Sequence, residues 1–264
     1  MVKLIEMIKV ELLTKFRYKI EIFSQSIDSI FMIFPAFAII LFSDYPASFG
    51  FSSKYEYLVF ILFSLVLWGF IENMWSSVFT IRRKFKEGTL EYNMTLPLKN
   101  YHYILGWSIN GLCSTIFELI PLICVSSFFI FQYLTLDKLL VMSIFLVVMI
   151  VASYGFCLVL VGLGLYFKEA DQICSLLANI APFLCGLFFP LAAMPKVFVG
   201  LSVVFPFTWG IDVLRSILFS TPTFIDFSLE IFLFITISFF YYCFGNWFFN
   251  KMKRKAMCDS LNKF

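Results

Sequence analysis

The sequence predicts an all-α integral membrane protein with six membrane-spanning helices, and three observations lead to that prediction. Hydrophobic residues make up 61% of the 264 residues and charged residues only 14%, whereas a soluble domain is about half apolar and about a quarter charged. The mean hydropathy is +0.92, and the 37 Phe residues would be poorly placed on a surface exposed to water. Finally, six apolar segments are each long enough to cross a bilayer, which takes about 20 residues.

The six candidate spans follow one another along a single transmembrane domain, residues 1–264. They are Ile22–Phe42, Tyr57–Ile81, Ile104–Phe131, Leu139–Phe167, Ile173–Leu191 and Phe227–Phe249. Residues 192–223 are also apolar but are interrupted at Pro195 and Pro206, so each piece is too short to cross. Because irregular backbone cannot face lipid, we expect external re-entrant or interfacial helices there, packed within the protein.

Lys and Arg are distributed unevenly over the loops, and this asymmetry predicts the orientation. Sixteen of the twenty lie before the first span, after the second and fourth spans, or after the sixth. The positive-inside rule places those segments in the cytoplasm. We therefore expect a multi-pass protein of the cytoplasmic (inner or plasma) membrane with both termini cytoplasmic. The net charge of +3 contains no block of charge that would indicate a nucleic-acid partner.

Residues 1–20 carry apolar side chains at helical spacing, with charged residues filling the opposite side. The apolar positions are Leu4, Ile5, Ile8, Leu12, Phe16 and Ile20. This pattern is typical of an amphipathic helix lying on the cytoplasmic membrane surface, in contact with lipid. A plain helical extension of the first span is the alternative.

Three acids lie inside the predicted spans: Asp28, Glu72 and Glu118. A charged side chain costs about 3 kcal/mol at the centre of a bilayer, so each acid should face protein or water rather than lipid. Glu72, its neighbour Asn73, and Glu118 are therefore candidates for a translocation path. The alternative is that the acids only form hydrogen bonds between packed helices.

Residues suited to catalysis or metal binding are scarce. His102 is the only histidine, and most of the seven Cys lie in apolar runs, where they behave as small hydrophobic residues. No catalytic motif is present, so we expect no catalytic, cofactor-binding or metal site in this chain. Gly155, Gly162 and Gly164 in the fourth span favour close helix packing rather than phosphate binding.

The loop at residues 82–101 is the most informative segment outside the membrane. It starts with basic residues and contains Glu87-Gly88-Thr89-Leu90-Glu91 before Pro97. Thr89 can cap a short helix that would expose Leu90, Tyr92 and Met94 to the cytoplasm. Such a helix is suited to docking a soluble partner, and a loop helix resting on lipid headgroups is the alternative.

Two motifs resemble those of the membrane subunits of type-2 ABC exporters. The Glu87–Glu91 motif followed by Pro97 resembles the coupling helix of that family. The second motif resembles the family's C-terminal pattern and consists of Met194-Pro195, Pro206-Phe207-Thr208-Trp209, and Asp212 with Arg215. Phe205 stands where many members carry Asn. The resemblance covers essentially the whole chain, and both motifs occur in the family's order.

The resemblance implies a permease subunit that performs no bond chemistry. A homodimer, or a heterodimer with a related permease, would form the path, and two copies of a separate ATP-binding subunit would dock below it and hold ATP and Mg²⁺. The implied ATPase-coupling residues are Arg82, Arg83, Glu87, Gly88, Thr89, Leu90, Glu91, Tyr92, Met94 and Pro97. The implied external gate consists of Pro195, Pro206, Trp209, Asp212 and Arg215.

The substrate class follows less directly from the sequence. An amphipathic or hydrophobic substrate, such as a drug, a lipid or a peptide, is favoured slightly over a polysaccharide or glycolipid. A different class of function, a secondary transporter driven by an ion gradient through Glu72 and Glu118, is the alternative. That alternative needs no ATPase, but it leaves the Glu87–Glu91 motif unexplained.

Overall fold

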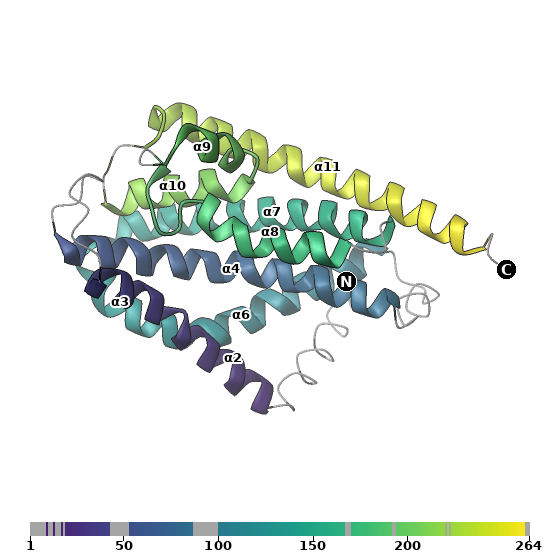
Figure 1. Ribbon diagram of the computed structural model, residues 1–264, viewed down its shortest axis with the longest axis horizontal. Coiled ribbons are helices and arrows are strands. Elements are labelled where there is room, and N and C mark those ends of the chain that lie inside the picture. Colours follow the sequence, from purple (N-terminus) through teal and green to yellow (C-terminus); the bar gives the residue numbers. More distant parts are fainter. Residues whose placement is uncertain are drawn as a thin grey trace.

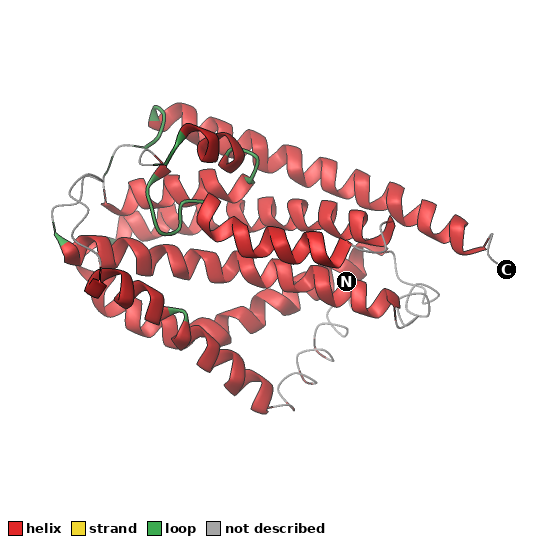
Figure 2. Ribbon diagram, viewed as in Figure 1, coloured by secondary structure: helices red, strands yellow, loops and turns green. Residues whose placement is uncertain are grey.

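The chain folds into a bundle of helices. The computed structural model describes residues 9, 13, 17, 19–42, 53–86, 100–166, 170–191, 194–219, 221 and 223–261. Within these residues there is no strand (Figure 2), which confirms the all-α class. In chain order the helices are α2 (Lys19–Phe31), α3 (Ile33–Phe42), α4 (Lys54–Lys86), α6 (Asn100–Ile130), the 3-10 turn η2 (Phe131–Tyr133), α7 (Leu136–Tyr166), α8 (Ala170–Leu184), α9 (Lys196–Ser202), α10 (Pro206–Phe219) and α11 (Phe227–Leu261).

Four helices in the described part of the chain are long and apolar enough to cross a membrane. Their apolar stretches are Lys54–Glu72, Thr115–Tyr133, Leu136–Gly164 and Phe227–Lys255, which correspond to the predicted second, third, fourth and sixth spans. The other two predicted spans appear as shorter apolar helices. The protein is therefore multi-pass, and the count of six remains a prediction.

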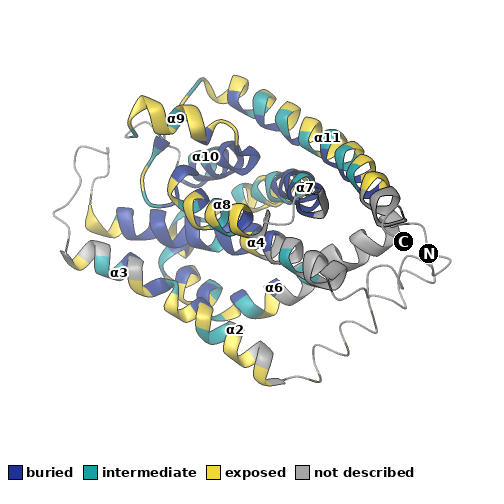
Figure 3. Cartoon of the chain, turned by 45° about the vertical axis from the view of Figure 1, so that its right-hand side comes forward, coloured by how far each residue is buried: buried dark blue, intermediate teal, exposed yellow. Residues whose placement is uncertain are grey.

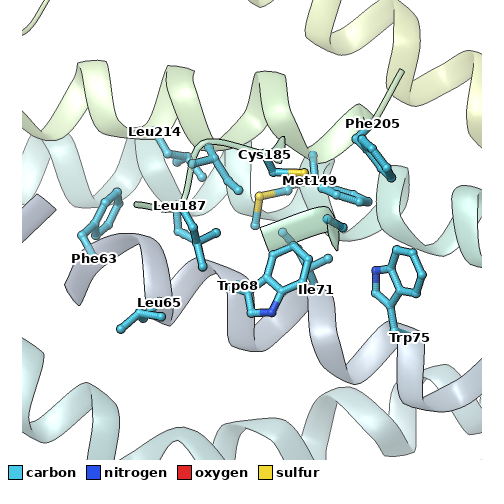
Figure 4. Close-up of a cluster of buried hydrophobic side chains, with 14 of the residues drawn as sticks. Phe63, Leu65, Trp68, Ile71, Trp75, Met149, Cys185, Leu187, Phe205 and Leu214 are labelled. Atoms are coloured by element: carbon cyan, nitrogen blue, oxygen red, sulfur yellow. The ribbon is translucent and has the colours of Figure 1, made fainter. Parts of the chain in front are cut away.

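Helix α4 lies at the centre of the core. Residues 57–65 are all buried, because this stretch is apolar on every face, and a helix apolar all round is stable only when surrounded. Figure 3 shows α4 and α10 as the most deeply buried helices, with α11 exposed along one side. Figure 4 shows Phe63 and Trp68 of α4 close to Leu187, which follows α8, and Leu214 of α10, all members of one buried cluster.

Helices α7 and α11 pack along each other (Figure 1) and approach closely at two glycines. A Cβ atom at Gly155 would lie 2.5 Å from the backbone carbonyl of Tyr241, and one at Gly245 would overlap the backbone of Gly155. Gly162 faces Phe248 of α11 in the same way. Small residues permit such contacts between membrane helices, so the packing role expected for Gly155 and Gly162 is confirmed.

The predicted first span, residues 22–42, is two helices rather than one. The chain leaves helical geometry at Met32, between α2 and α3. A proline at position 35 accounts for the break, because proline has no backbone N–H to donate to the carbonyl four residues earlier. The span at residues 22–42 therefore stays a prediction, with a break in the helix at Met32.

The predicted fifth span, residues 173–191, is also shorter than expected. Helix α8 ends at Leu184, and Gly186 has a φ of +74°. The Leu187 N–H donates to the Pro182 carbonyl at 3.2 Å, which with the left-handed glycine makes a Schellman motif. Helix α8 therefore ends before the predicted boundary of the span at Leu191, and residues 185–190 form a turn that packs on the core.

The broken region before the last span is confirmed as broken. Helices α9 and α10 are bent by 105° relative to each other. Most of α10 is buried, whereas most of α9 is exposed, so only α10 is packed within the protein. Residues 203–205, which connect them, are called the bend below.

Two predicted cytoplasmic elements lie largely or wholly outside the described residues. The amphipathic helix at residues 1–20 is described only at residues 9, 13, 17, 19 and 20. The coupling motif from Glu87 to Pro97 lies in the segment 87–99, outside the described residues. Both elements remain predictions.

Candidate functional site: charges within the helical bundle

The three intramembrane acids, although distant in sequence, come within electrostatic range on three helices. Glu72 of α4 interacts electrostatically with both Asp28 of α2 and Glu118 of α6. Asp28 and Glu72 are exposed, and Glu118 is half-buried. The Ser29 hydroxyl donates to the backbone carbonyl of Glu118 at 2.7 Å and so fixes α2 on α6. We call Asp28, Glu72 and Glu118 the acidic edge.

The exposure of the acidic edge restricts what can lie next to it. Exposed apolar side chains surround Glu118 on α6, including Ile116 and Ile120, and these suit contact with lipid. Ionised carboxylates do not suit that contact and require water or protein. Within a membrane, the acidic edge therefore has to face either a second protein chain or a water-filled path.

The side chain of Arg215 is buried in the core, where it contacts α4 and the turn at residues 185–190. Its Nε donates to the Ser64 Oγ at 2.8 Å, with a second bond from Nη2, and Nη2 also donates to the Leu187 carbonyl at 3.0 Å. The guanidinium lies 3.9 Å from the centre of the Phe60 ring. The Tyr57 hydroxyl donates to the Phe188 carbonyl at 2.9 Å. Arg215 therefore clamps α10 to α4 and to the turn at residues 185–190.

Asp212 and Arg215 belong to one predicted motif, but their side chains serve different contacts. Asp212 Oδ2 accepts a hydrogen bond from the Phe224 N–H at 3.1 Å, in the connection between α10 and α11. Arg215 bonds to α4 and to the turn after α8. The motif thus supplies two separate attachments of the same helix.

The remaining predicted gate residues lie at α9, the bend and α10. Pro195 is the N-cap of α9 and Pro206 is the first residue of α10, positions that suit a residue without a free N–H. The Trp209 indole donates to the Val203 carbonyl at 3.3 Å, and the Tyr241 hydroxyl of α11 donates to the Val204 carbonyl at 2.6 Å. These contacts hold the bend, and the gating role itself remains a prediction.

Of the predicted coupling residues, the structure describes only the backbone of Arg82 and Arg83. Arg82 and Arg83 lie near the C-terminal end of α4, and their side chains are outside the described set, as is that of Asn73 in the predicted path. Glu87, Gly88, Thr89, Leu90, Glu91, Tyr92, Met94 and Pro97 are outside it entirely. Their role in coupling stays a prediction.

Sequence reasoning missed three polar residues that the structure makes important. Ser64 and Tyr57 form the surroundings of Arg215, and Ser64 could have been noticed as an isolated hydroxyl in an apolar stretch. Glu230 is completely buried in the first turn of α11. Glu230 could have been noticed as an acid just inside the predicted sixth span, near its end rather than at its middle.

The chemistry of the described side chains offers no catalytic constellation. No three His, Cys, Asp or Glu residues among those described are placed to hold a metal ion together. The described cysteines form no disulfide bond with one another, and three of them, Cys157, Cys174 and Cys185, are buried. What the arrangement provides is a packed core, a hydrogen-bonded buried cation and an exposed acidic edge.

Comparison with known protein families gives the identity of this arrangement. A family model described as ABC-2 type transporter matches residues 3–219, from the N-terminal segment to the end of α10. No curated protein matches the chain. Members of this family are membrane subunits that associate with ATP-binding subunits, and ATP is hydrolysed in those partner subunits. The chain, an all-helical multi-pass membrane protein, therefore belongs to the ABC-2 type transporter family and is the permease subunit of an ABC transporter.

Proposed function

We propose that two copies of this permease, powered by two ATP-binding subunits, export an amphipathic substrate that carries a positive charge. The observation that carries this proposal is the acidic edge. Asp28, Glu72 and Glu118 bring three acids within electrostatic range of one another on helices that also expose apolar side chains. A path lined by carboxylates and apolar side chains suits a molecule that is both hydrophobic and cationic.

The distribution of exposed residues supports a second copy. Ile173, Leu176, Ile180 and Phe183 on α8 are exposed and apolar, while Asp28 and Glu72 are exposed and charged. A partner permease would cover both surfaces and leave the carboxylates facing a shared path. A homodimer is the simplest such assembly, and a heterodimer with a related permease would satisfy the same argument.

The charged ends of the helices support docking of the ATP-binding subunits at one end of the bundle. Helices α4 and α11 both end at the same end of the bundle (Figure 1). Those ends carry Arg82, Arg83, Lys84 and Lys86 on α4, and Lys251, Lys253, Arg254 and Lys255 on α11. Lys251 lies 4.9 Å above the ring of Trp247, a pairing typical of a membrane interface. The positive-inside rule makes this end cytoplasmic, and the segment 87–99 follows directly from it.

Docking of the ATP-binding subunit is assigned to the segment from Glu87 to Pro97. Reversing the charges, Glu87→Lys with Glu91→Lys, should abolish stimulation of the partner's ATPase while the permease still inserts and purifies normally. Asp137→Lys is the matched control, because this exposed acid lies at the start of α7, at the opposite end of the bundle. Equal stimulation in the double variant and the control would contradict the docking assignment.

The substrate class is tested with two ions of the same shape and opposite charge. The permease and its ATP-binding partner are reconstituted in liposomes and supplied with tetraphenylphosphonium or tetraphenylborate. We expect ATP-dependent movement of the cation only, and loss of that movement in Glu72→Gln with Glu118→Gln. Equal transport of both ions would contradict the role of the acidic edge.

The same liposomes separate this function from ion-gradient transport. Transport that requires ATP and survives a protonophore supports the proposal. Transport that proceeds without the ATP-binding subunit and stops when the proton gradient collapses would instead favour a secondary transporter. A response only to a lipid-linked glycan would favour polysaccharide export.

A further inference from the structure

The connection between α10 and α11 brings two carboxyl groups together. Asp212 lies on α10, and Glu230 lies in the first turn of α11. The Glu230 carboxyl group lies beside the Asp212 carboxyl group, the Thr223 hydroxyl and the backbone of Ile225. These groups meet where α11 begins, at the end of the bundle opposite the C-terminus (Figure 1).

Glu230 is completely buried, yet its carboxylate has no hydrogen-bond partner in the described part of the chain. Its side chain is 0% exposed, and neither oxygen has a donor in hydrogen-bonding geometry. Its backbone N–H is used separately, donating to the Asp226 carbonyl at 2.9 Å. A buried carboxyl group in a folded protein is paired with a cation, coordinates a metal or takes up a proton, so the position of Glu230 calls for a cation or a proton.

The neighbouring cation of this chain does not supply that charge. Arg215, one turn beyond Asp212 on α10, lies within electrostatic range of Asp212. Its guanidinium is directed to Ser64 and Leu187 on other elements.

The groups around the two acids form a set of oxygen ligands. Asp212 Oδ2 accepts a hydrogen bond from the Phe224 N–H, and the Asp212 carboxyl group lies beside that of Glu230. The Thr223 hydroxyl donates its proton to the Ile225 carbonyl, which leaves its lone pairs free to face the carboxylates. Carboxylate and hydroxyl oxygens, completed by water, are the ligands of hard divalent cations such as Ca²⁺ and Mg²⁺.

We propose that Asp212, Thr223 and Glu230 bind one hard divalent cation, Ca²⁺ or Mg²⁺, which ties the start of α11 to α10. A proton shared between the carboxyl groups is the competing explanation for two adjacent acids. The Asp212 and Glu230 carboxyl groups lie close enough for such a bond, so the response to added cation separates the two explanations. The site is separate from the acidic edge and does not depend on which substrate is transported.

The test uses the full chain in lipid nanodiscs after treatment with EDTA. CaCl₂ and MgCl₂ are titrated by calorimetry at constant ionic strength, and thermal unfolding is followed with and without each ion. We expect one bound cation per chain and, at saturation, a rise in the unfolding temperature of about 3 °C or more. Glu230→Gln and Asp212→Asn should each weaken binding at least about tenfold.

Asp226→Asn is the matched control, because Asp226 is an exposed acid only four residues before Glu230. It should bind the cation as the natural chain does. If Glu230→Gln fails to fold, Asp212→Asn carries the test, since Asp212 is only half-buried. The proposal is overturned if neither ion binds, or if Asp226→Asn weakens binding as much as the other variants. If neither cation changes the stability of the natural chain and Glu230→Gln is more stable than that chain, the two carboxyl groups share a proton instead.

Discussion

The core around α4 and the acidic edge differ in how their charged side chains are surrounded. In the core, 72% of the apolar stretch of α4 is buried, and Arg215 has its guanidinium bonded to Ser64 and Leu187. At the edge, only 28% of the apolar stretch of α6 is buried, and the acids of α2 and α4 are exposed.

This difference separates structural charges from functional ones. Arg215 is enclosed by partners from its own chain, so its removal should damage the fold. The exposed carboxylates at the edge have surroundings that the single chain does not complete, so their removal should spare the fold and affect what meets that edge. The following variants test this separation, from the largest expected change in stability to the smallest.

Replacing Arg215 should give the largest loss. Arg215→Ala removes the clamp between α10, α4 and the turn at residues 185–190, and leaves the Ser64 hydroxyl and the Leu187 carbonyl buried without their donor. We expect the free energy of unfolding to fall by about 3–5 kcal/mol, measured by thermal unfolding of the purified permease in detergent.

Arg215→Met is the control for lost volume, because it fills the space without the charge. It should be more stable than Arg215→Ala but less stable than the natural chain, since the same two acceptors remain unpaired. If the free energy of unfolding of Arg215→Ala is within about 1 kcal/mol of that of the natural chain, the clamp does not stabilise the fold. Arg215 would then be grouped with the functional charges of the acidic edge.

The sequence predicted the long helices of the core well but not the interruptions of the shorter ones. Pro35, Pro121 and Pro182 each lie after the first residue of an apolar helix. Pro35 accompanies a break after Phe31, whereas α6 continues through Pro121 and α8 through Pro182. Whether a proline breaks a membrane helix depends on which neighbours satisfy the freed carbonyl, and that is decided by tertiary packing.

The crossing of α7 and α11 tests how tightly the core is packed. Gly155→Leu places a side chain against the backbone of Tyr241, and the helices must separate to admit it. We expect a loss of about 2–3 kcal/mol in the free energy of unfolding, measured by the same thermal assay.

Gly200→Leu on α9 provides the contrast, because a Cβ atom at Gly200 meets nothing within 4 Å. It should leave the unfolding temperature nearly unchanged. Equal losses in the two variants would mean that the glycines act through helix propensity rather than through the crossing.

Ser64 tests the clamp from its other side. Ser64→Ala removes the acceptor of two N–H groups of a buried guanidinium and should cost about 1.5–2 kcal/mol. Ser143→Ala is the control, since this exposed hydroxyl bonds only to the Leu140 carbonyl one turn earlier. A Ser64→Ala variant as stable as Ser143→Ala would show that Leu187 and Phe60 alone satisfy Arg215.

The candidate site was predictable in its members but not in its arrangement. The high cost of an acid in a membrane span singled out Asp28, Glu72 and Glu118 individually. Nothing in the sequence states the register in which α2, α4 and α6 pack, so their convergence on one edge could not be derived. Glu230 was missed because the acid lies near the end of its span, where an aqueous position is the ordinary expectation.

The acids of the edge should give the smallest change in stability and a clear change in function. Glu72→Gln keeps the size of an exposed side chain and removes its charge, so the free energy of unfolding should change by no more than about 0.5 kcal/mol. Loss of one charge-assisted contact should weaken the apparent affinity for a cationic substrate about tenfold, measured as the concentration of tetraphenylphosphonium that half-saturates ATP-dependent transport. Asp137→Asn, an exposed acid outside the edge, should leave that concentration unchanged. A Glu72→Gln variant that transports normally but unfolds easily would place Glu72 with Arg215 among the structural charges.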